Sequence, residues 1–237
     1  MTDALQDALQ VDGLTSGYGT SEVISDVSFA LARSEVLAVI GKNGMGKTSL
    51  LKAVLGFLPA WRGRVTFAGA DVTRMPPHQK RRLGLVYVPQ EHALFQDLTI
   101  RDNLRLGLLS DRELDASLDH VGEWFPVLTR RLRQRAGTLS GGEQKMLIVA
   151  RALMARPEVL LLDEVTEGLQ PSLVDRLSDV LTRFRQEIGT SMIVIEQHLP
   201  FALGIANRYL VFKRGEIVDS ARVDAGAEAR IEAHMRI

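Results

Sequence analysis

Residues 41–48, with the sequence GKNGMGKT, fit the pattern G-x-x-x-x-G-K-[ST] and are called the phosphate loop below. Its glycines allow a tight turn in which several backbone N–H groups point at one anion. The N-terminus of a following helix adds positive potential. Lys47 can reach the β- and γ-phosphates of a nucleotide, and the Thr48 hydroxyl can bind Mg²⁺. The alternative is a glycine-rich turn without a ligand, but the spacing, the lysine and the threonine together favour phosphate binding.

Two acidic residues, Asp163 and Glu164, follow the apolar run 159–162. Ligands of parallel sheets gather at the carboxyl ends of the strands, where this pair is expected. Asp163 can hold Mg²⁺ directly or through water, and Glu164 can polarise the water that attacks a γ-phosphate. A strand that ends in solvated charges has the same pattern, so the pair is informative mainly because the phosphate loop is present.

A third motif, LSGGE at residues 139–143, is called the signature below. Ser140 and Glu143 form an S-x-x-E capping box, which predicts a helix over about 142–155. Gly141 and Gly142 leave the entering backbone without side chains, and a bare helix N-terminus can bind phosphate. Without the other motifs, an ordinary capped helix is the simpler interpretation.

The elements that position these motifs have distinct patterns. Four short runs are apolar on both faces, which is typical of central strands in a covered parallel sheet: 36–40, 85–88, 159–162 and 192–195. Residues 11–31 alternate polar and apolar positions, as an antiparallel strand pair does. Residues 91–156 are mostly helical in pattern. The sequence predicts one α/β domain, with a core at 1–90 and 157–237 that includes an N-terminal antiparallel β part, and a helical subdomain insert at 91–156.

The composition excludes several classes of function. Lysine plus arginine and aspartate plus glutamate both number 29 in 237 residues, so an electrostatic nucleic-acid binder is disfavoured. We interpret the basic cluster at 130–135 as a solvated loop or a docking surface. The absence of cysteine excludes a Cys-ligated zinc site and a cysteine nucleophile. No run approaches the roughly 18 apolar residues of a membrane span, and residues 1–10 lack the pattern of a signal peptide.

In this order, GKNGMGKT, LSGGE and VLLLDE resemble the nucleotide-binding subunits of ABC transporters, over about residues 11–218. The resemblance implies a RecA-like P-loop core, a helical subdomain carrying the signature, and a head-to-tail dimer. Each ATP would lie between the phosphate loop of one protomer and the signature of the other. The implied catalytic residues are Glu164, Gln197 and Lys47. The implied ATP contacts in the two motifs, or directly after the first, are Gly41, Asn43, Gly44, Gly46, Lys47, Thr48, Ser49, Ser140, Gly141, Gly142 and Glu143.

Two further residues match this family by position. Tyr18 occupies the place of the aromatic residue that stacks on adenine, although a buried tyrosine at a strand edge is the alternative. Gln90 matches the glutamine that senses the γ-phosphate and Mg²⁺, with Thr48 and Asp163 as the other metal ligands. By the same resemblance, the region 91–103 receives a helix of a membrane partner, and Thr99 and Asp102 can cap a helix there.

The sequence departs from the family pattern in three places. Val165 follows Glu164 where proline is usual, and GLQP at 168–171 replaces the common S-x-L-D. Gln197 stands where the family has a switch histidine, and His198 follows it. In an extended segment His198 would point to the opposite side. We expect Gln197 to take the switch role, with His198 as the rival and a surface position for His198 as the other possibility.

The segments EGLQPS and IEQH resemble the uptake branch that serves branched-chain amino acids or urea and short amides. The resemblance implies an ATPase that uses ATP and Mg²⁺, pairs with a second ATP-binding subunit of the same or a different kind, and drives separate permease subunits. It would lie at the cytoplasmic face of the membrane and work indirectly with an extracytoplasmic substrate-binding protein. The alternatives are a soluble ABC-type ATPase acting on nucleic acid or ribosomes, and a module that holds ATP without hydrolysing it.

Overall fold

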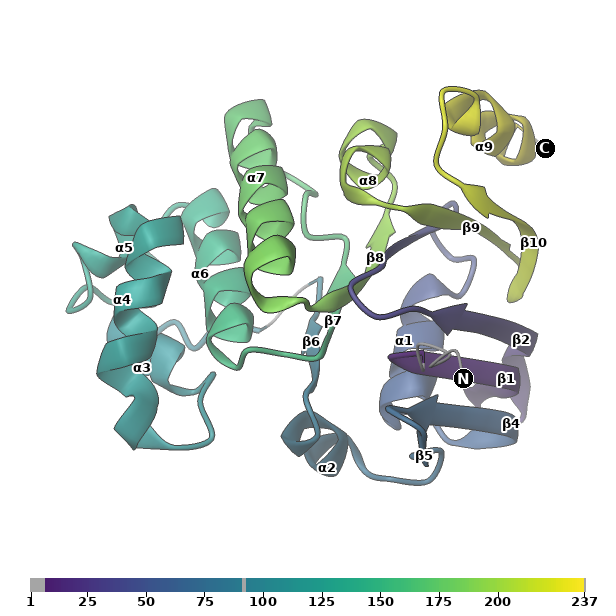
Figure 1. Cartoon of the computed structure of the whole chain (residues 1–237), viewed down its shortest axis with the longest axis horizontal. Helices are drawn as coiled ribbons and strands as arrows, with labels where there is room; N and C mark the ends of the chain where they lie inside the picture. Colours follow the sequence, from purple (N-terminus) through teal and green to yellow (C-terminus); the bar gives the residue numbers. More distant parts are fainter. Residues whose placement is uncertain (1–6, 91–92, 237) are drawn as a thin grey trace, which may run out of the picture.

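The computed structural model describes residues 7–90 and 93–236, which form two β-sheets with helices around them (Figure 1). The smaller sheet has the strand order β2-β1-β4-β5 and is antiparallel. Its strands are β1 (Leu9–Tyr18), β2 (Ser21–Leu31), β4 (Ala60–Phe67) and β5 (Ala70–Asp71). The antiparallel pair predicted within 11–31 is therefore confirmed as β1 and β2.

The larger sheet has the order β10-β9-β3-β8-β7-β6. Its strands are β3 (Val36–Ile40), β6 (Leu85–Val88), β7 (Val159–Asp163), β8 (Ser191–Glu196), β9 (Arg208–Lys213) and β10 (Glu216–Arg222). The first five pair in parallel, whereas β10 pairs antiparallel with β9. The four predicted central strands coincide with β3 and β6 or lie inside β7 and β8, which confirms the α/β fold.

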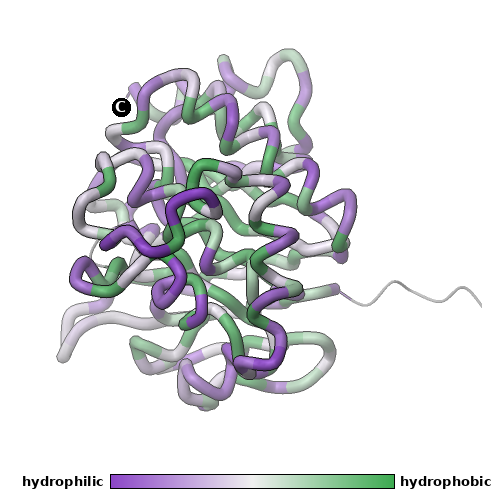
Figure 2. The backbone as a smooth tube through the Cα atoms, turned by 90° about the vertical axis from the view of Figure 1, so that its left-hand side faces the viewer, coloured by the Kyte–Doolittle hydropathy of each residue, from purple (hydrophilic) through white to green (hydrophobic). Residues whose placement is uncertain are grey.

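The central strands are covered on both faces, as their continuous apolar sequences predict. Leu160 and Leu162 of β7 pack into one core with the helical part of the chain, whereas Val159 and Leu161 pack into another with the smaller sheet. Figure 2 shows the same arrangement, with apolar segments inside and polar segments toward the outer turns. Because β3, β7 and β8 are parallel, their carboxyl ends lie at one edge of the sheet.

The helices are α1 (Lys47–Leu55), α2 (Pro77–Arg82), α3 (Ile100–Arg105), α4 (Leu114–Trp124), α5 (Pro126–Thr129), α6 (Gly141–Met154), α7 (Pro171–Ile188), α8 (Leu199–Ile205) and α9 (Ala227–Met235). Short 3₁₀ helices cover Asp111–Glu113 and Ala136–Thr138. Helices α3 to α6 lie together at the left of Figure 1. The predicted cap is present, because Thr99 accepts a hydrogen bond from the backbone N–H of Asp102. Helix α6 begins and ends one residue earlier than predicted.

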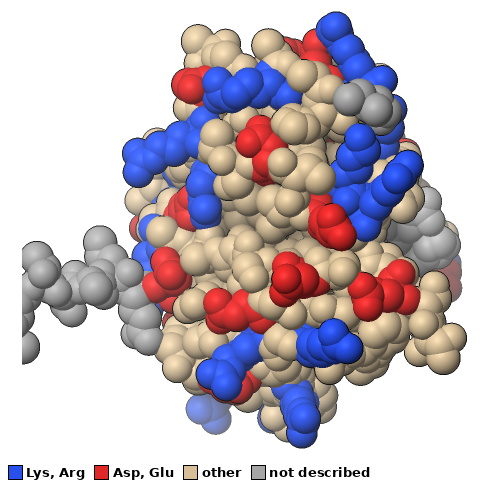
Figure 3. Space-filling view, turned by 90° about the vertical axis from the view of Figure 1, so that its right-hand side faces the viewer, with Lys and Arg blue, Asp and Glu red and all other residues tan. Residues whose placement is uncertain are grey.

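The surface carries charges of both signs. On the face shown in Figure 3, acidic and basic side chains are interspersed. Within residues 7–90 and 93–236, no helix combines the length and the apolar composition that crossing a bilayer requires. The prediction that residues 1–10 are not a signal peptide falls mostly outside the described part of the chain.

One lysine is buried under the phosphate-loop helix. Lys80 of α2 is 1% exposed, and its ammonium donates a 2.6 Å hydrogen bond to the carbonyl of Val54 in the last turn of α1. Burial lowers the pKa of Lys80 from 10.5 to about 8. Between these values the unfolded chain binds the proton and the folded chain does not, so stability rises with pH in this window.

We therefore expect the free energy of unfolding to rise by up to about 3 kcal/mol between pH 8 and 10.5 through this one group. The measurement is urea unfolding across this pH range, compared with Lys80→Met, in which this increment is absent. The difference between the two proteins isolates Lys80 from the other groups that titrate there. Parallel stability curves for the two proteins would contradict the assignment.

Candidate functional site

The phosphate loop lies between β3 and α1, as its sequence predicts. Gly44 and Gly46 have φ values of 77° and 99°, in the left-handed region that favours glycine. Gly41 lies so close to the neighbouring strand that a Cβ there would be 2.3 Å from the carbonyl oxygen of Phe212. These glycines allow the loop to curve around a cavity of about 310 Å³ at the N-terminus of α1. A helix N-terminus at such a cavity favours an anion.

Lys47 is the buried cation of this loop. Its side chain is 4% exposed, and its ammonium donates to the carbonyls of Gly41 at 2.6 Å and Lys42 at 3.0 Å. The same nitrogen lies 3.3 Å from Oε1 of Glu164, whose side chain is 6% exposed. This ion pair joins the phosphate loop to the end of β7. A phosphate entering the cavity would compete with Glu164 for the ammonium, because both are anionic partners of Lys47.

The carboxylate of Asp163 is held from both sides at the end of β7. Its Oδ1 accepts a 3.2 Å hydrogen bond from the hydroxyl of Thr48, and its Oδ2 accepts a 2.9 Å hydrogen bond from the phenol of Tyr87 in β6. Burial raises the pKa of Asp163, and the two hydroxyl donors oppose the rise. Burial, followed by the charge of Asp163, raises the pKa of Tyr87, so this phenol stays protonated and donates.

Gln90 connects this site to the following loop. Its amide donates to Oε2 of Glu164 at 3.1 Å and to Oε2 of Glu167 at 2.7 Å. Gln90 and Glu164 both line the cavity of the phosphate loop. The glutamine thus contacts the predicted catalytic carboxylate directly, and it lies at the point where the chain leaves β6 for the helical region.

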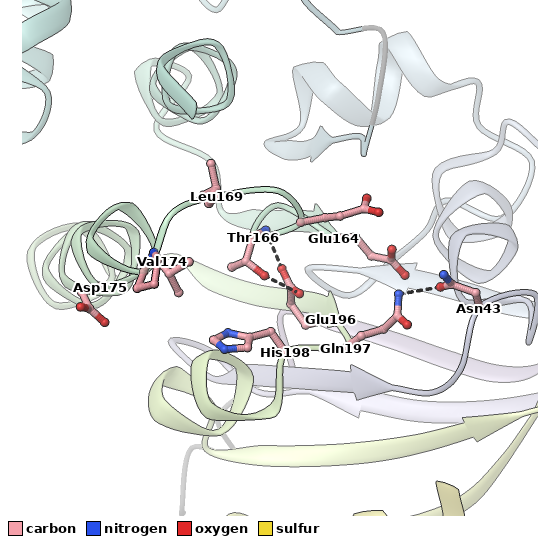
Figure 4. Close-up of a pocket in the computed structure, with 11 residues that line it drawn as sticks. Asn43, Glu164, Thr166, Leu169, Val174, Asp175, Glu196, Gln197 and His198 are labelled. Carbon is pink, nitrogen blue, oxygen red and sulfur yellow. Dashed lines mark hydrogen bonds between the residues drawn. The ribbon is translucent and has the colours of Figure 1, made fainter. Parts of the chain in front are cut away.

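The end of β8 brings Gln197 to the phosphate loop. The amide of Gln197 donates a 2.6 Å hydrogen bond to Oδ1 of Asn43 (Figure 4). His198 points the other way, toward Val174 and Asp175 of α7 (Figure 4). This geometry agrees with the expected opposite orientation of the two side chains and favours Gln197 for the switch role.

Tyr18 lies at the end of β1 with 48% of its surface exposed. It is therefore not the buried strand-edge tyrosine that was the alternative. Its phenol lies 3.4 Å from the hydroxyl of Ser49 in α1, and it lines a cavity together with Thr48. An exposed ring beside the phosphate loop is free to stack on a base.

The signature forms the capped start of α6. The Ser140 hydroxyl accepts from the backbone N–H of Glu143, and the Glu143 carboxylate accepts from the backbone N–H of Ser140, so the predicted capping box is complete. A hydrogen bond from the Ser140 backbone N–H lowers the pKa of Glu143, with smaller contributions from the Ser140 hydroxyl and from Arg131. A Cβ on Gly141 would meet no heavy atom within 4 Å, so the helix N-terminus is open to the surface.

The chain brings together most of the predicted residues but leaves the signature apart. The phosphate-loop cavity is lined by Asn43, Gly44, Gly46, Lys47, Thr48, Ser49, Gln90 and Glu164, with Val23. Asp163 reaches this group through Thr48, and Gln197 reaches it through Asn43. Among the residues that the structure describes, no signature residue lines this cavity. Each chain thus presents a phosphate loop and a separate helix N-terminus.

Sequence reasoning missed three residues that hold this site. Tyr87 binds Asp163, Arg131 binds the carboxylate of Glu143 at 2.5 Å, and Glu196 binds Thr166. Arg131 belongs to the basic cluster that was interpreted as a solvated loop or a docking surface. The contacts of Tyr87 and Glu196 join residues that are far apart in the sequence, so no local sequence pattern predicts them. The position of Glu196 directly before Gln197 was the one available signal.

Comparisons with known proteins agree with this geometry. The family model described as ABC transporter matches residues 24–167. The chain is 36% identical over 212 residues to the high-affinity branched-chain amino acid transport ATP-binding protein BraG of Pseudomonas aeruginosa, covering 89% of this chain and 91% of that one. It is 36% identical over 205 residues to the probable branched-chain amino acid transport ATP-binding protein LivF of Archaeoglobus fulgidus, covering 84% and 85%.

Other relatives have a different cargo in their names. The molybdate/tungstate import ATP-binding protein WtpC of Thermococcus kodakarensis is 33% identical over 213 residues, covering 89% of this chain and 63% of that one. Among solved structures, a nucleotide-free ATP-binding cassette from an ABC transporter superposes with a TM-score of 0.87 over 96% of both chains at 23% identity, which supports the RecA-like fold. The chain belongs to the ABC transporter family, as an ATP-binding subunit with ATPase activity.

Proposed function

We propose that this chain is the ATP-hydrolysing subunit of an importer for branched-chain amino acids. The observation that carries the catalytic part is the junction of Lys47, Glu164 and Gln90 at the phosphate-loop cavity, in which the first two side chains are buried. The proposed division of labour is a core at 1–90 and 157–237, which binds and hydrolyses ATP, and a helical subdomain at 91–156, which presents the signature.

In this proposal the phosphate loop holds the triphosphate of ATP. Backbone N–H groups at the start of α1 and the ammonium of Lys47 bind its anionic oxygens, and Tyr18 stacks on the base. Glu164 orients the attacking water as a general base, and the amide of Gln197 donates to the γ-phosphate. The water attacks phosphorus in line while the bond to the β-phosphate oxygen breaks, which is mainly a matter of positioning and electrostatics.

The oxygen donors near the phosphate loop fit a magnesium ion. Thr48 and Asp163 place a hydroxyl and a carboxylate 3.2 Å apart, and Gln90, whose side-chain amide carries an oxygen, lines a cavity together with both of them. Hard oxygen ligands of this kind suit Mg²⁺ bound together with substrate phosphates. When bound, the ion would neutralise part of the charge on the phosphate oxygens.

Dimerisation completes the site in this proposal. The open N-terminus of α6 would bind the γ-phosphate of an ATP held by the phosphate loop of a second subunit. That subunit is either a copy of this chain or a different ATP-binding protein. The separation of the signature from the phosphate-loop cavity within one chain supports this arrangement.

A surface groove near Gln90 is proposed to receive the permease. Phe95 and Leu106 are 56% and 48% exposed and line a cavity of about 340 Å³ together with Arg81, Ile148 and Arg151. The guanidinium of Arg151 lies 5.9 Å from the centre of the Phe95 ring. This cation–π contact stabilises the position of Phe95 at the edge of the groove. An apolar floor with basic rims suits a short helix from a membrane partner. Two residues of the predicted docking region, Glu91 and His92, lie outside the described residues.

The cargo is proposed from the relatives. The names of BraG and LivF state branched-chain amino acid transport, and both match this chain at 36% identity over nearly its whole length. This favours branched-chain amino acids over urea and short amides. The proposed location is the cytoplasmic face of the membrane, held there by permease subunits that also receive substrate from an extracytoplasmic binding protein.

Uptake by the assembled transporter tests the proposal. The chain is tagged in its native host, and the membrane complex that it forms is purified, reconstituted in vesicles and supplied with ATP. We expect ATP-dependent accumulation of radiolabelled leucine that urea does not reduce. The control is the same complex with Lys47→Ala, which cannot use ATP. Accumulation of urea or molybdate in place of leucine, or recovery of the chain without any membrane protein, would refute the assignment.

A further inference from the structure

A buried carboxylate lies beside the catalytic cluster. Glu196 is the last residue of β8 and is 2% exposed. Its Oε1 accepts a 2.9 Å hydrogen bond from the backbone N–H of Thr166, and its Oε2 accepts a 2.8 Å hydrogen bond from the hydroxyl of the same residue (Figure 4). Within residues 7–90 and 93–236, no lysine or arginine forms an ion pair with Glu196.

A carboxylate in this position is costly for the fold. Burial raises the pKa of Glu196, and the two hydrogen bonds from Thr166 oppose that rise. An apolar side chain of similar size would fill the same space without the cost of desolvating a charge. The carboxylate supplies two acceptor oxygens at once, so it fixes both the backbone and the side chain of Thr166.

The residue that Glu196 holds belongs to the turn of the catalytic glutamate. Thr166 follows Glu164 by two positions, and Glu164 has a φ of 49°, which strains a residue other than glycine. The backbone N–H of Glu164 also donates to the carbonyl of Ile195 in β8 at 2.9 Å. The end of β8 therefore holds the turn at two points. Between them Val165 lacks the ring by which a proline would fix φ.

We propose that Glu196 is a positioning residue for ATP hydrolysis, which holds the turn of Glu164 in register with the strand end that carries Gln197. The inference rests on the roles proposed above for Glu164 and Gln197. Glu196 does not line the phosphate-loop cavity, whereas Glu164 does. Its loss should therefore lower kcat and leave the affinity for ATP unchanged.

The test compares Glu196→Gln and Glu196→Ala in the purified full-length subunit. The amide keeps the size of the side chain but replaces one acceptor oxygen with a donor, so we expect a partial loss of kcat. We expect the alanine to lower kcat by roughly 10- to 100-fold, the scale of a displaced catalytic group. Phosphate release gives kcat, and equilibrium dialysis with ATP gives the affinity.

Changes at Thr166 show whether the effect passes through this contact. Thr166→Ser keeps both donors and should retain kcat, whereas Thr166→Ala loses the hydroxyl and should lower it. Combining Thr166→Ala with Glu196→Ala should cost less than the two separate losses together, because both act on one contact. Glu35→Ala is the matched control, since Glu35 is a largely buried carboxylate that pairs with Arg208. It immediately precedes β3, at the end of that strand away from the phosphate loop. It should lower stability and leave kcat unchanged.

Two results would overturn the inference. One is unchanged kcat in a folded Glu196→Gln or Glu196→Ala protein. The other is a loss in which ATP affinity, melting temperature and kcat fall together, as for a purely structural residue. Failure of the proposed function would give a different result. ATP turnover would then persist in Glu164→Gln, whatever the effect of the changes at Glu196.

Discussion

Replacing Glu164 with glutamine should lower ATP turnover by about 10²- to 10⁴-fold, the usual contribution of a general base. Binding of ATP should persist, because the amide fills the same space beside Lys47 and Gln90. Loss of the negative charge also removes the anion with which phosphate competes for the ammonium of Lys47. ATP is therefore expected to bind at least as tightly as in the unchanged chain.

The measurement is phosphate release under saturating ATP, together with equilibrium binding of ATP to the same preparation. Glu158→Gln is the control, since Glu158 is exposed and lies directly before the first residue of β7, whereas Glu164 lies directly after the last. That change should leave both quantities unaltered. Glu164→Gln turnover close to that of the unchanged chain would exclude Glu164 as the catalytic base. Unaltered ATP binding with no turnover in the unchanged chain would indicate a module that holds ATP without hydrolysing it.

Mixing two inactive variants should restore ATP hydrolysis. Lys47→Ala removes the cation of the phosphate loop, and Gly141→Asp places a carboxylate at the start of α6. Because a Cβ on Gly141 meets no heavy atom within 4 Å, the aspartate has room at this position, and we expect its own chain to fold as before. A head-to-tail pair made of one variant of each kind contains one site with an intact phosphate loop and an intact signature. In a random equimolar mixture half of the pairs are of this mixed kind, so roughly a quarter of all sites are intact.

The control for this experiment is the double variant that carries both changes. Mixed with either single variant, it forms only pairs in which every site has at least one defective half, so neither mixture should hydrolyse ATP. The position of the second change matters, since a Cβ on Gly142 would be 2.4 Å from the Leu173 side chain, which would have to move within the protomer itself. Full activity of Gly141→Asp alone, or no recovery on mixing, would contradict head-to-tail pairing of this chain.

Local patterns predict the elements that carry the motifs. Each of β3, β6, β7 and β8 is a continuous apolar run, and the start of α6 is encoded by Ser140 and Glu143 only three positions apart. In each case a residue's conformation is decided by its neighbours in the chain. The α/β fold could therefore be predicted, including the antiparallel pair of β1 and β2.

Contacts between distant segments could not be predicted in the same way. Tyr87 meets Asp163 because β6 pairs with β7, and Glu196 meets Thr166 because β8 pairs with β7 on its other side. Those pairings depend on the strand order, which neither strand's sequence contains. The exposure of Tyr18 also depends on packing. The family resemblance assigned the catalytic residues, and their roles stay predictions until the variants above are measured.

The outer strands of the larger sheet influence how the protein behaves when it is concentrated. A free strand edge can recruit another chain and start aggregation. At one side β6 has only four residues and is followed by Pro89, which has no N–H to offer. At the other side β10 carries Glu216, Asp219 and Arg222 along a strand of alternating exposure. Both features discourage the growth of fibres by strand addition at the edges of this sheet, so aggregation of the concentrated subunit should start elsewhere on its surface.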